Sequence, residues 1–367
     1  MAEQPKNFGF GEDEVMLRDS ARKFLSDHCS SDTLHRMVAS DFNLDRPNEC
    51  VWDQALWQQI VDLGWTAVCV PEAAGGIGMP AVAAITLAEE VGRTAFPSPL
   101  IATLSATFVL NACDSPAATA ALSEIAGGKA TALALTNIDG EWDSAATGVR
   151  VNADGRLDGL AAFVQDARKC AQFIVSAQSD AGVGLYLVSA AAEGLTLTPD
   201  SIIDLTRDQA RLTFEQVDAI ELAAPGTGHA AIDAALPGLL CLVAADMVGA
   251  GEWLLQTTVE YAKTRVQFDR PLGFFQAVKH PLVNVMLQID NAKSLTYNAA
   301  CAIDHDPAEA LRLARMAKSE ASDMAVFSSS RAVQFHGGIG FTWECYVHLF
   351  FKRQMHNQVL YGDAKYQ

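Results

Sequence analysis

The sequence predicts an α+β protein in three parts: an N-terminal helical domain, a middle β domain and a C-terminal helical bundle. Up to residue 127, apolar residues recur at near-helical spacing with charged residues between them. After Gly127-Gly128 the pattern changes to short apolar runs separated by Gly, Asp and Asn, which is typical of strands. Past Gly228 the helical period returns and persists. We therefore expect domains at residues 1–128, 129–228 and 229–367.

The N-terminal part predicts helices over Glu12 to Cys29 and over Trp52 to Leu63, because apolar residues recur there at helical spacing. A loop rich in Pro and Gly follows at residues 70–78, and Ala81 to Val91 resumes a helix. In the middle part, apolar runs predict the strands of a small β domain. These runs are residues 131–135, 148–151, 173–177, 184–188 and 212–214.

The C-terminal part predicts long helices from Ile232 to Ala262 and from Gln276 to Ile303. Asp306-Pro307 is a plausible N-cap and first residue of a third helix. We interpret the apolar face of that third helix as core; it carries Leu311, Ala314, Ala321, Met324, Ala325, Ala332 and Phe335.

Composition excludes several classes of protein. Half of the 367 residues are hydrophobic, and the net charge of -18 argues against nucleic acid or an anionic membrane as a partner. We expect no membrane span and no signal peptide, because no uninterrupted apolar run is long enough and the first residues lack the basic-then-apolar order. The eight cysteines include no C-x-x-C pair, so we expect free thiols in a reducing cytoplasm and no zinc site.

The acidic charge is unevenly distributed along the chain. From Glu252 onward there are 12 Lys and Arg against 11 Asp and Glu, which leaves 14 against 33 for the rest. The C-terminal third is therefore the part best suited to contact a pyrophosphate, although solvated surface charge would give the same count.

Two stretches of this C-terminal third form the most specific pattern. The first, residues 265–276, reads R-x-x-F-x-x-P-L-G-x-x-Q, and the second, residues 334–341, reads Q-x-x-G-G-x-G-F. Together they resemble the C-terminal helical domain of the acyl-CoA dehydrogenases. The resemblance implies FAD as cofactor, with its adenosine and pyrophosphate gripped across a subunit boundary. The residues implied in this grip are Arg265, Phe268, Gln276, Gln334, Gly337 and Gly338.

The resemblance extends over nearly the whole chain. The P-E-x-x-G-G-x-G loop at residues 71–78 and the E-E-x-G-R segment at residues 89–93 are similar to the N-terminal domain of that family. Residues 212–217 resemble the last strand of its middle domain. We attach no chemistry to these segments.

The flavin-ring cradle of the family is poorly preserved. The family typically shows A-L-T-E-P-x-x-G-S-D, and residues 134–143 of this chain read A-L-T-N-I-D-G-E-W-D. Thr136 is kept, but the E-P and G-S-D elements are not. The family's L-N-G-x-K becomes L-D-G-L-A at residues 157–161, and its Trp-or-Phe-Ile-Thr-Asn stretch becomes F-V-Q-D at residues 163–166. Asp139, Glu141 and Asp143 would also place negative charge near a pyrophosphate held there.

The catalytic carboxylate is also missing. Removing the weakly acidic α-proton of a thioester requires a carboxylate in a dry site, where burial raises its pKa. The family usually places it in I-Y-E-G-T, where this chain has Gly362, and a minority place it near the position of Leu239. Asp246 and Asp363 could replace it. We favour a helix-interface polar contact for Asp246 and a surface carboxylate for Asp363.

Three hypotheses follow from this pattern. The first is a non-catalytic subunit of a heteromeric dehydrogenase, similar to the α2β2 enzymes of bacterial steroid side-chain degradation, with an acyl-CoA substrate and, by analogy, electron-transferring flavoprotein as acceptor. The second is a self-sufficient homo-oligomer, and the third is a flavin-free scaffold of the same fold. In the first, an apolar stripe could contact the unlike subunit, although such a stripe is more often core. It consists of Leu282, Val285, Met286 and Ile289.

Overall fold

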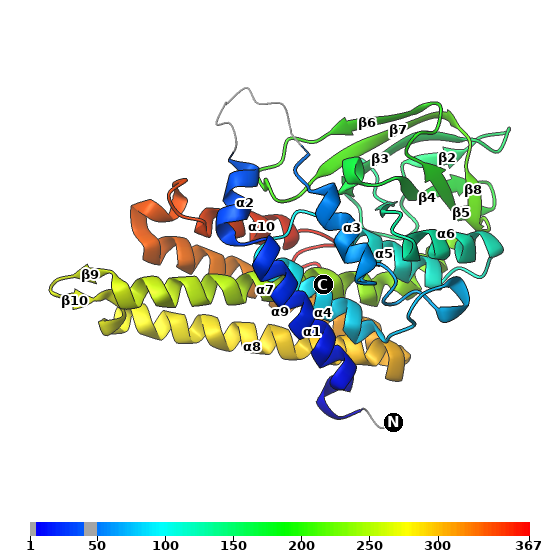
Figure 1. The fold of residues 1–367 in the computed structure, drawn as a ribbon. Helices are drawn as coiled ribbons and strands as arrows, with labels where there is room; N and C mark the ends of the chain where they lie inside the picture. The colour runs from blue at the N-terminus through cyan, green and yellow to red at the C-terminus, as the bar shows by residue number, and fades with distance from the viewer. Residues whose placement is uncertain (1–4, 40–49) are drawn as a thin grey trace.

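The computed structural model describes residues 5–39 and 50–367, and its helical parts come before and after a β sheet in the chain. The sheet lies at the upper right in Figure 1, with the helical bundle extending below and to the left of it. This confirms the expected α+β class. The N-terminal helices are α1 (Glu12–His28), α2 (Ser31–Val38), α3 (Gln54–Asp62), α4 (Ala81–Thr94), α5 (Leu100–Asn111) and α6 (Pro116–Ala126). The C-terminal helices are α7 (Gly228–Thr264), α8 (Gln276–His305), α9 (Pro307–His336) and α10 (Val347–Asn357). Pro307 occupies the first turn of α9, as expected, but the Asp306 side chain makes no capping hydrogen bond within the described chain.

The middle of the chain forms a mixed sheet of eight strands in the order β6-β7-β3-β2-β4-β5-β8, with β1 paired in parallel to β4. The strands are β1 (Thr131–Ala134), β2 (Val149–Val151), β3 (Leu157–Gln165), β4 (Gln172–Ser179), β5 (Gly182–Ser189), β6 (Leu195–Pro199), β7 (Gln209–Val217) and β8 (Ile220–Ala223). Strands β3, β6 and β8 were not predicted from the sequence. The last two lie at the edges of the sheet and are partly exposed, which weakens their apolar signal.

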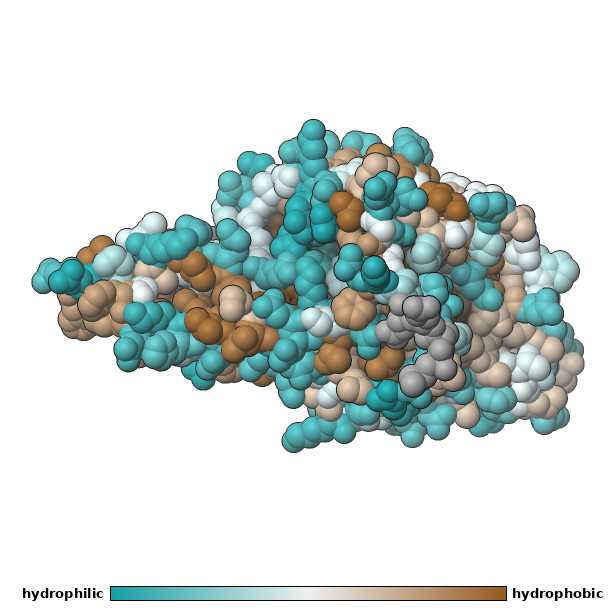
Figure 2. Space-filling view, turned by 90° about the horizontal axis from the view of Figure 1, so that it is seen from below, coloured by the Kyte–Doolittle hydropathy of each residue, from teal (hydrophilic) through white to brown (hydrophobic). Residues whose placement is uncertain are grey.

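The apolar stripe of α8 does not form a single exposed face. Leu282, Val285 and Ile289 are at most 8% exposed and pack inside this chain, which favours the core alternative for these three residues. Helical periodicity alone does not separate two adjacent faces of a helix. The exposed apolar side chains of α8 are Val283, Met286 and Leu287. Figure 2 shows apolar side chains gathered along the helical arm on the face seen from below.

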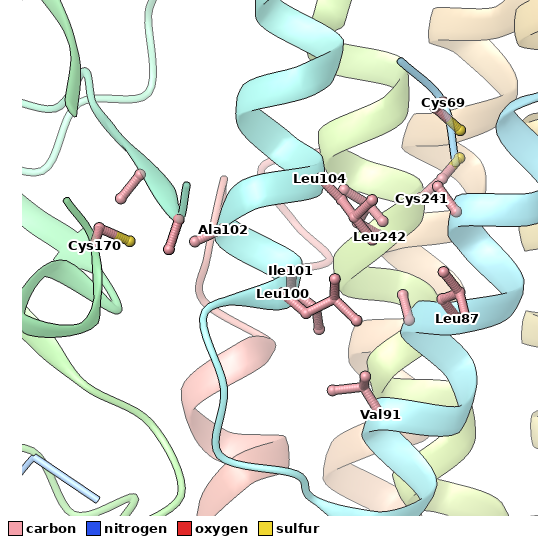
Figure 3. Close-up of a cluster of buried hydrophobic side chains, with 14 of the residues drawn as sticks. Cys69, Leu87, Val91, Leu100, Ile101, Ala102, Leu104, Cys170, Cys241 and Leu242 are labelled. Carbon is pink, nitrogen blue, oxygen red and sulfur yellow. The ribbon is translucent and has the colours of Figure 1, made fainter. Parts of the chain in front are cut away.

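Helix α7 is the central element of the core. By length and composition alone it could cross a membrane, but 83% of its most apolar stretch is buried inside the protein. Leu87 and Val91 of α4 and Leu104 of α5 lie near Cys241 and Leu242 of α7 (Figure 3). The cysteines are free, as expected, and five of them are buried: Cys29, Cys69, Cys170, Cys241 and Cys301.

The helices α4 and α7 cross with their backbones in contact. A Cβ atom at Gly92 would overlap the carbonyl oxygen of Asp246, and one at Gly249 would overlap that of Glu89. The buried Glu89 carboxylate accepts hydrogen bonds from Lys293 and from the Tyr297 hydroxyl of α8. The E-E-x-G-R segment therefore serves helix packing, which agrees with assigning it no chemistry.

Candidate functional site

The first C-terminal motif forms a hairpin that projects from the end of α7. Strands β9 (Val266–Gln267) and β10 (Arg270–Pro271) pair in antiparallel fashion. Phe268 and Asp269 connect them with positive φ angles of 54° and 59°, the backbone of a type I′ turn, which usually requires Gly or Asn. This turn holds the Phe268 ring 86% exposed. A bulky aromatic side chain in such a turn is a strained arrangement that marks candidate functional positions.

The second motif lies beside the first, at the same end of the helical bundle (Figure 1). The ring of His336, the last residue of α9, stacks on that of Tyr261 near the end of α7, with 4.4 Å between ring centroids. Gly337 follows with a φ of 64° and opens a 3₁₀ turn, η5 (Gly337–Phe341). A Cβ atom on Gly337 or Gly338 would meet no heavy atom of the described residues within 4 Å. Both glycines therefore leave room for a group that approaches from outside.

The six residues implied in the FAD grip all lie at this end with surface exposed to solvent: Arg265, Phe268, Gln276, Gln334, Gly337 and Gly338. Among residues 5–39 and 50–367, the Arg265 side chain has no hydrogen-bond or ion-pair partner. A guanidinium left free by the described chain, at the same end of the bundle as two open glycine backbones, fits an anionic dinucleotide. A ligand of this surface must reach it from outside the chain.

The stretches expected to hold a flavin ring and a base meet elsewhere, between the sheet and the helices. They line two small cavities that share Leu135, Thr136, Trp142 and Tyr361. One cavity also touches Phe163, Gln165, Asp166 and Arg207, and the other touches Leu239. The segments selected from the sequence therefore converge in space.

Both cavities are too small for a flavin ring or an acyl chain. Their volumes are about 50 Å³ and about 30 Å³, whereas pockets for small molecules typically measure about 300–1,000 Å³. The Trp142 and Tyr361 rings lie 5.0 Å apart between centroids, tilted by 50°. These two rings occupy the space between the cradle segment and the C-terminal turn. The residues of this chain therefore do not fit its own flavin ring.

The backbone at Gly362 is unsuited to the family's glutamate. Gly362 has a φ of 95°, which favours glycine, and a Cβ atom there would overlap the side chain of Tyr366. The neighbouring Asp363 is exposed, and its carboxylate accepts hydrogen bonds from the backbone N–H groups of Lys365 and Tyr366. Asp363 therefore stabilises the last turn at the surface.

Asp246 is fully buried and fully paired. Its carboxylate accepts hydrogen bonds from Arg353 at 2.8 and 2.5 Å, from Arg207 at 2.7 Å and from Asn357 at 2.8 Å. Burial alone would raise the pKa of Asp246, but the charges and hydrogen bonds of Arg353, Arg207 and Asn357 hold it below its ordinary value. A general base near neutral pH needs the opposite shift. Asp246 is therefore a structural anion that joins α7 to α10 and to the segment before β7.

The residues that close the cavities were not found from the sequence. Trp142 was visible only as a departure from the family's cradle pattern, and nothing in that pattern indicates where its ring points. The sequence marks Tyr361 only as the residue before Gly362. It gives no signal for Arg207, whose side chain is 4% exposed, lines the larger cavity and pairs with Asp246.

Comparison with known proteins identifies the family. The descriptions "Acyl-CoA dehydrogenase, N-terminal domain" and "Acyl-CoA dehydrogenase, C-terminal domain" match residues 11–125 and 226–367. Acyl-CoA dehydrogenase IpdE2 of Mycobacterium tuberculosis is 33% identical over 344 residues, which cover 93% of this chain and 91% of that protein. The chain belongs to the acyl-CoA dehydrogenase family. Members of this family are FAD-dependent oxidoreductases, and the resemblance stated from the sequence motifs is confirmed.

Solved structures agree with this acyl-CoA dehydrogenase fold. A structure of a variant of the Tcur3481-Tcur3483 steroid ACAD superposes with a TM-score of 0.86 at 29% identity and covers 97% of this chain and 96% of that chain. The ChsE4-ChsE5 complex from Mycobacterium tuberculosis gives a TM-score of 0.85 at 22% identity, with 98% and 96% of the chains covered. The second likeness shows the fold alone.

Proposed function

We propose that this acyl-CoA dehydrogenase homologue is the non-catalytic subunit of a heteromeric enzyme. In this proposal a related partner subunit holds the flavin ring and supplies the base. The chain described here contributes the grip on the FAD adenosine and pyrophosphate through Arg265, Phe268, Gln276, Gln334, Gly337 and Gly338. FAD supplies the hydride-accepting chemistry when bound, and this chain positions it.

One contrast within the molecule carries the proposal. The grip surface is open, with glycine backbones free of neighbours and an Arg265 that has no partner among the described residues. Trp142 and Tyr361, in contrast, contact each other where they line the two small cavities between the segments expected to hold the chain's own flavin ring. A homo-oligomer of such chains would contain only half-sites. A partner that retains its cradle and base would complete one site per pair of unlike chains.

The names of solved relatives support a substrate class and an assembly for the proposal. A solved relative at 29% identity is named as a steroid ACAD and carries two protein names, Tcur3481 and Tcur3483. This supports a CoA thioester of a steroid side chain as the substrate, an α2β2 assembly, and a role in bacterial steroid degradation. Electron-transferring flavoprotein as the electron acceptor, and a cytoplasmic location, follow by analogy with the family.

Two alternatives make different predictions. A self-sufficient homo-oligomer requires a base and a cradle within this chain, and the pairing of Asp246 together with the small cavities argues against both. A flavin-free scaffold requires no grip, and the exposed Arg265 at the same end of the bundle as the open Gly337 and Gly338 argues against it.

Native mass spectrometry of the chain alone and of the chain co-expressed with a paralogous dehydrogenase subunit tests the proposal. An adjacent gene for a subunit with an intact cradle would supply the first partner to try. The chain alone should carry no FAD and self-associate through its exposed apolar surface, and the pair should hold one FAD per two unlike chains. A homodimer or homotetramer with one FAD per chain would refute the heteromeric assignment.

Asp363→Asn should leave turnover of the assembled enzyme within a few-fold of wild type, because its carboxylate only accepts two backbone hydrogen bonds at the surface. A true general base contributes roughly 10²–10⁴-fold to the rate. Steady-state kinetics with an acyl-CoA substrate and an artificial electron acceptor measure this. A thousand-fold loss, with FAD content and folding preserved, would place the base in this chain.

A further inference from the structure

Lys318 of α9 is a buried lysine with an unusual set of partners. Its side chain is 0% exposed. The ammonium donates hydrogen bonds to Gly362 O at 2.7 Å, to Ser322 Oγ at 2.9 Å and to Gln358 O at 3.0 Å. These three bonds use all three donors of the ammonium. Two of them reach the turn that follows α10.

The neighbouring residue of α9 holds the same segment. The Ser319 hydroxyl donates to Ala364 O at 3.0 Å. Two successive residues of α9 therefore bind three backbone carbonyls within residues 358–364. We call the contacts of Lys318 and Ser319 to these carbonyls the α9 clamp. A segment held by main-chain carbonyls is fixed in position whatever its side chains are.

The clamped segment presents Tyr361 to the cavities. Tyr361 has a φ of 57°, a left-handed conformation that is uncommon for an aromatic residue. The turn around it must be held from outside, because such backbone persists only where its surroundings determine it. On the other side, the Tyr361 ring contacts Trp142 of the loop that follows β1.

We propose that Lys318 is a positioning residue: through the α9 clamp it holds Tyr361 against Trp142 and so keeps this chain's own cavity closed. The inference rests on the proposed function only where it treats that cavity as the place of the missing flavin ring. The contacts from α9 through Tyr361 to the Trp142 loop stand without it.

The clamp can persist in both protonation states of Lys318. Burial lowers the pKa of Lys318 to about 8, and the charge of Asp363 opposes that shift. A neutral amine keeps two N–H groups for the carbonyls of Gln358 and Gly362, while the Ser322 hydroxyl can turn to donate to the nitrogen lone pair. The Lys318 amine, the Ser322 hydroxyl and the two carbonyls then all remain hydrogen-bonded.

Hydrogen exchange followed by mass spectrometry on the full chain, in the assembly in which it purifies, tests the proposal. Lys318→Met keeps the aliphatic volume but removes every donor. We expect exchange at least about ten-fold faster in residues 358–366. We also expect faster exchange in residues 139–147, whose described amide bonds include Ala146 N–H to Asp143 O. Peptides of β5 should not change.

A matched control is Lys365→Met, which removes an exposed lysine from the same segment and should change neither region. The Tyr361→Ala background separates positioning from general destabilisation. In that background, Lys318→Met should still speed hydrogen exchange in residues 358–366. It should cause no further increase in exchange in residues 139–147, because both substitutions act there through the same Tyr361–Trp142 contact. Additive acceleration of residues 139–147, or equal acceleration throughout the chain, would overturn the proposal.

If Lys318→Met does not fold, Ser319→Ala removes one clamp bond and should accelerate the same two regions to a smaller extent. No change in residues 139–147 with that variant would also overturn the proposal. None of these readouts depends on FAD. A homo-oligomer with FAD in every chain would refute the proposed function by mass spectrometry and leave the exchange results to be judged separately.

Discussion

Asp246→Ala should lower the free energy of unfolding by about 3–5 kcal/mol, because it removes the carboxylate that accepts hydrogen bonds from the two buried guanidinium groups of Arg353 and Arg207. Arg353 is 0% exposed at its side chain and Arg207 is 4% exposed, so water cannot replace the lost carboxylate. Urea or guanidinium chloride unfolding followed by circular dichroism measures the change.

Asp363→Ala is the control for this experiment, because it removes an exposed carboxylate from the same C-terminal part and should cost far less. The pKa of Asp246 is lower in the folded protein than its ordinary value of 3.8. The carboxylate therefore makes its full contribution to the free energy of unfolding above pH 3.8, and this contribution is lost as the pH falls from there through the lower pKa of the folded state. A loss under about 1 kcal/mol for Asp246→Ala would contradict the structural role assigned to it.

Arg265→Ala should weaken FAD binding by the assembled heteromer about 10- to 100-fold, the loss expected for a charge-assisted hydrogen bond to a pyrophosphate. The Arg265 side chain is exposed and unpaired among the described residues, so its removal should not disturb the fold. Titration of apo-heteromer with FAD, followed by flavin fluorescence, gives the affinity directly.

Arg270→Ala is a matched control for the charge of the hairpin. Arg270 lies on the same hairpin, but its guanidinium sits over the Phe274 ring at 5.2 Å. It should therefore affect FAD binding less than Arg265→Ala. If both substitutions weaken FAD binding equally, Arg265 contributes only its positive charge and makes no specific contact. Unchanged FAD affinity after Arg265→Ala would refute the assignment of Arg265 to the grip.

The long helices and the three-part order of the chain could be predicted from the sequence, because their apolar faces have a clear period. Helix α5 could not, since nearly all of its residues are buried and it has no polar face to set a period. Strands β6 and β8 lie at the sheet edges, where partly exposed Thr and Glu residues interrupt the apolar pattern.

The candidate site was predicted unevenly for similar reasons. Spacing along the chain identified the two motifs. The stacking of the His336 ring, in the second motif, on the ring of Tyr261, which precedes the first motif, could be found only from the structure. Spacing could not reveal the Trp142–Tyr361 contact, because it joins a loop after β1 to a turn after α10. The burial of Lys318 could not be predicted, because a lysine on a helix is usually solvated. The carbonyls that pair with Lys318 lie 40 or more residues away in the chain.

The closed cavity has a consequence for the evolution of this chain. A glutamate at position 362 meets the side chain of Tyr366 and a backbone angle that favours glycine. Even if that residue were accommodated, the rings of Trp142 and Tyr361 would still fill the space before it. Under the proposed function, no single codon change would therefore restore an independent site, since the base, the rings and the cradle loop would have to change together. In the heteromer proposed above, the closed cavity would make the dependence on a partner subunit hard to reverse, and selection would then act on the fit between the two unlike subunits.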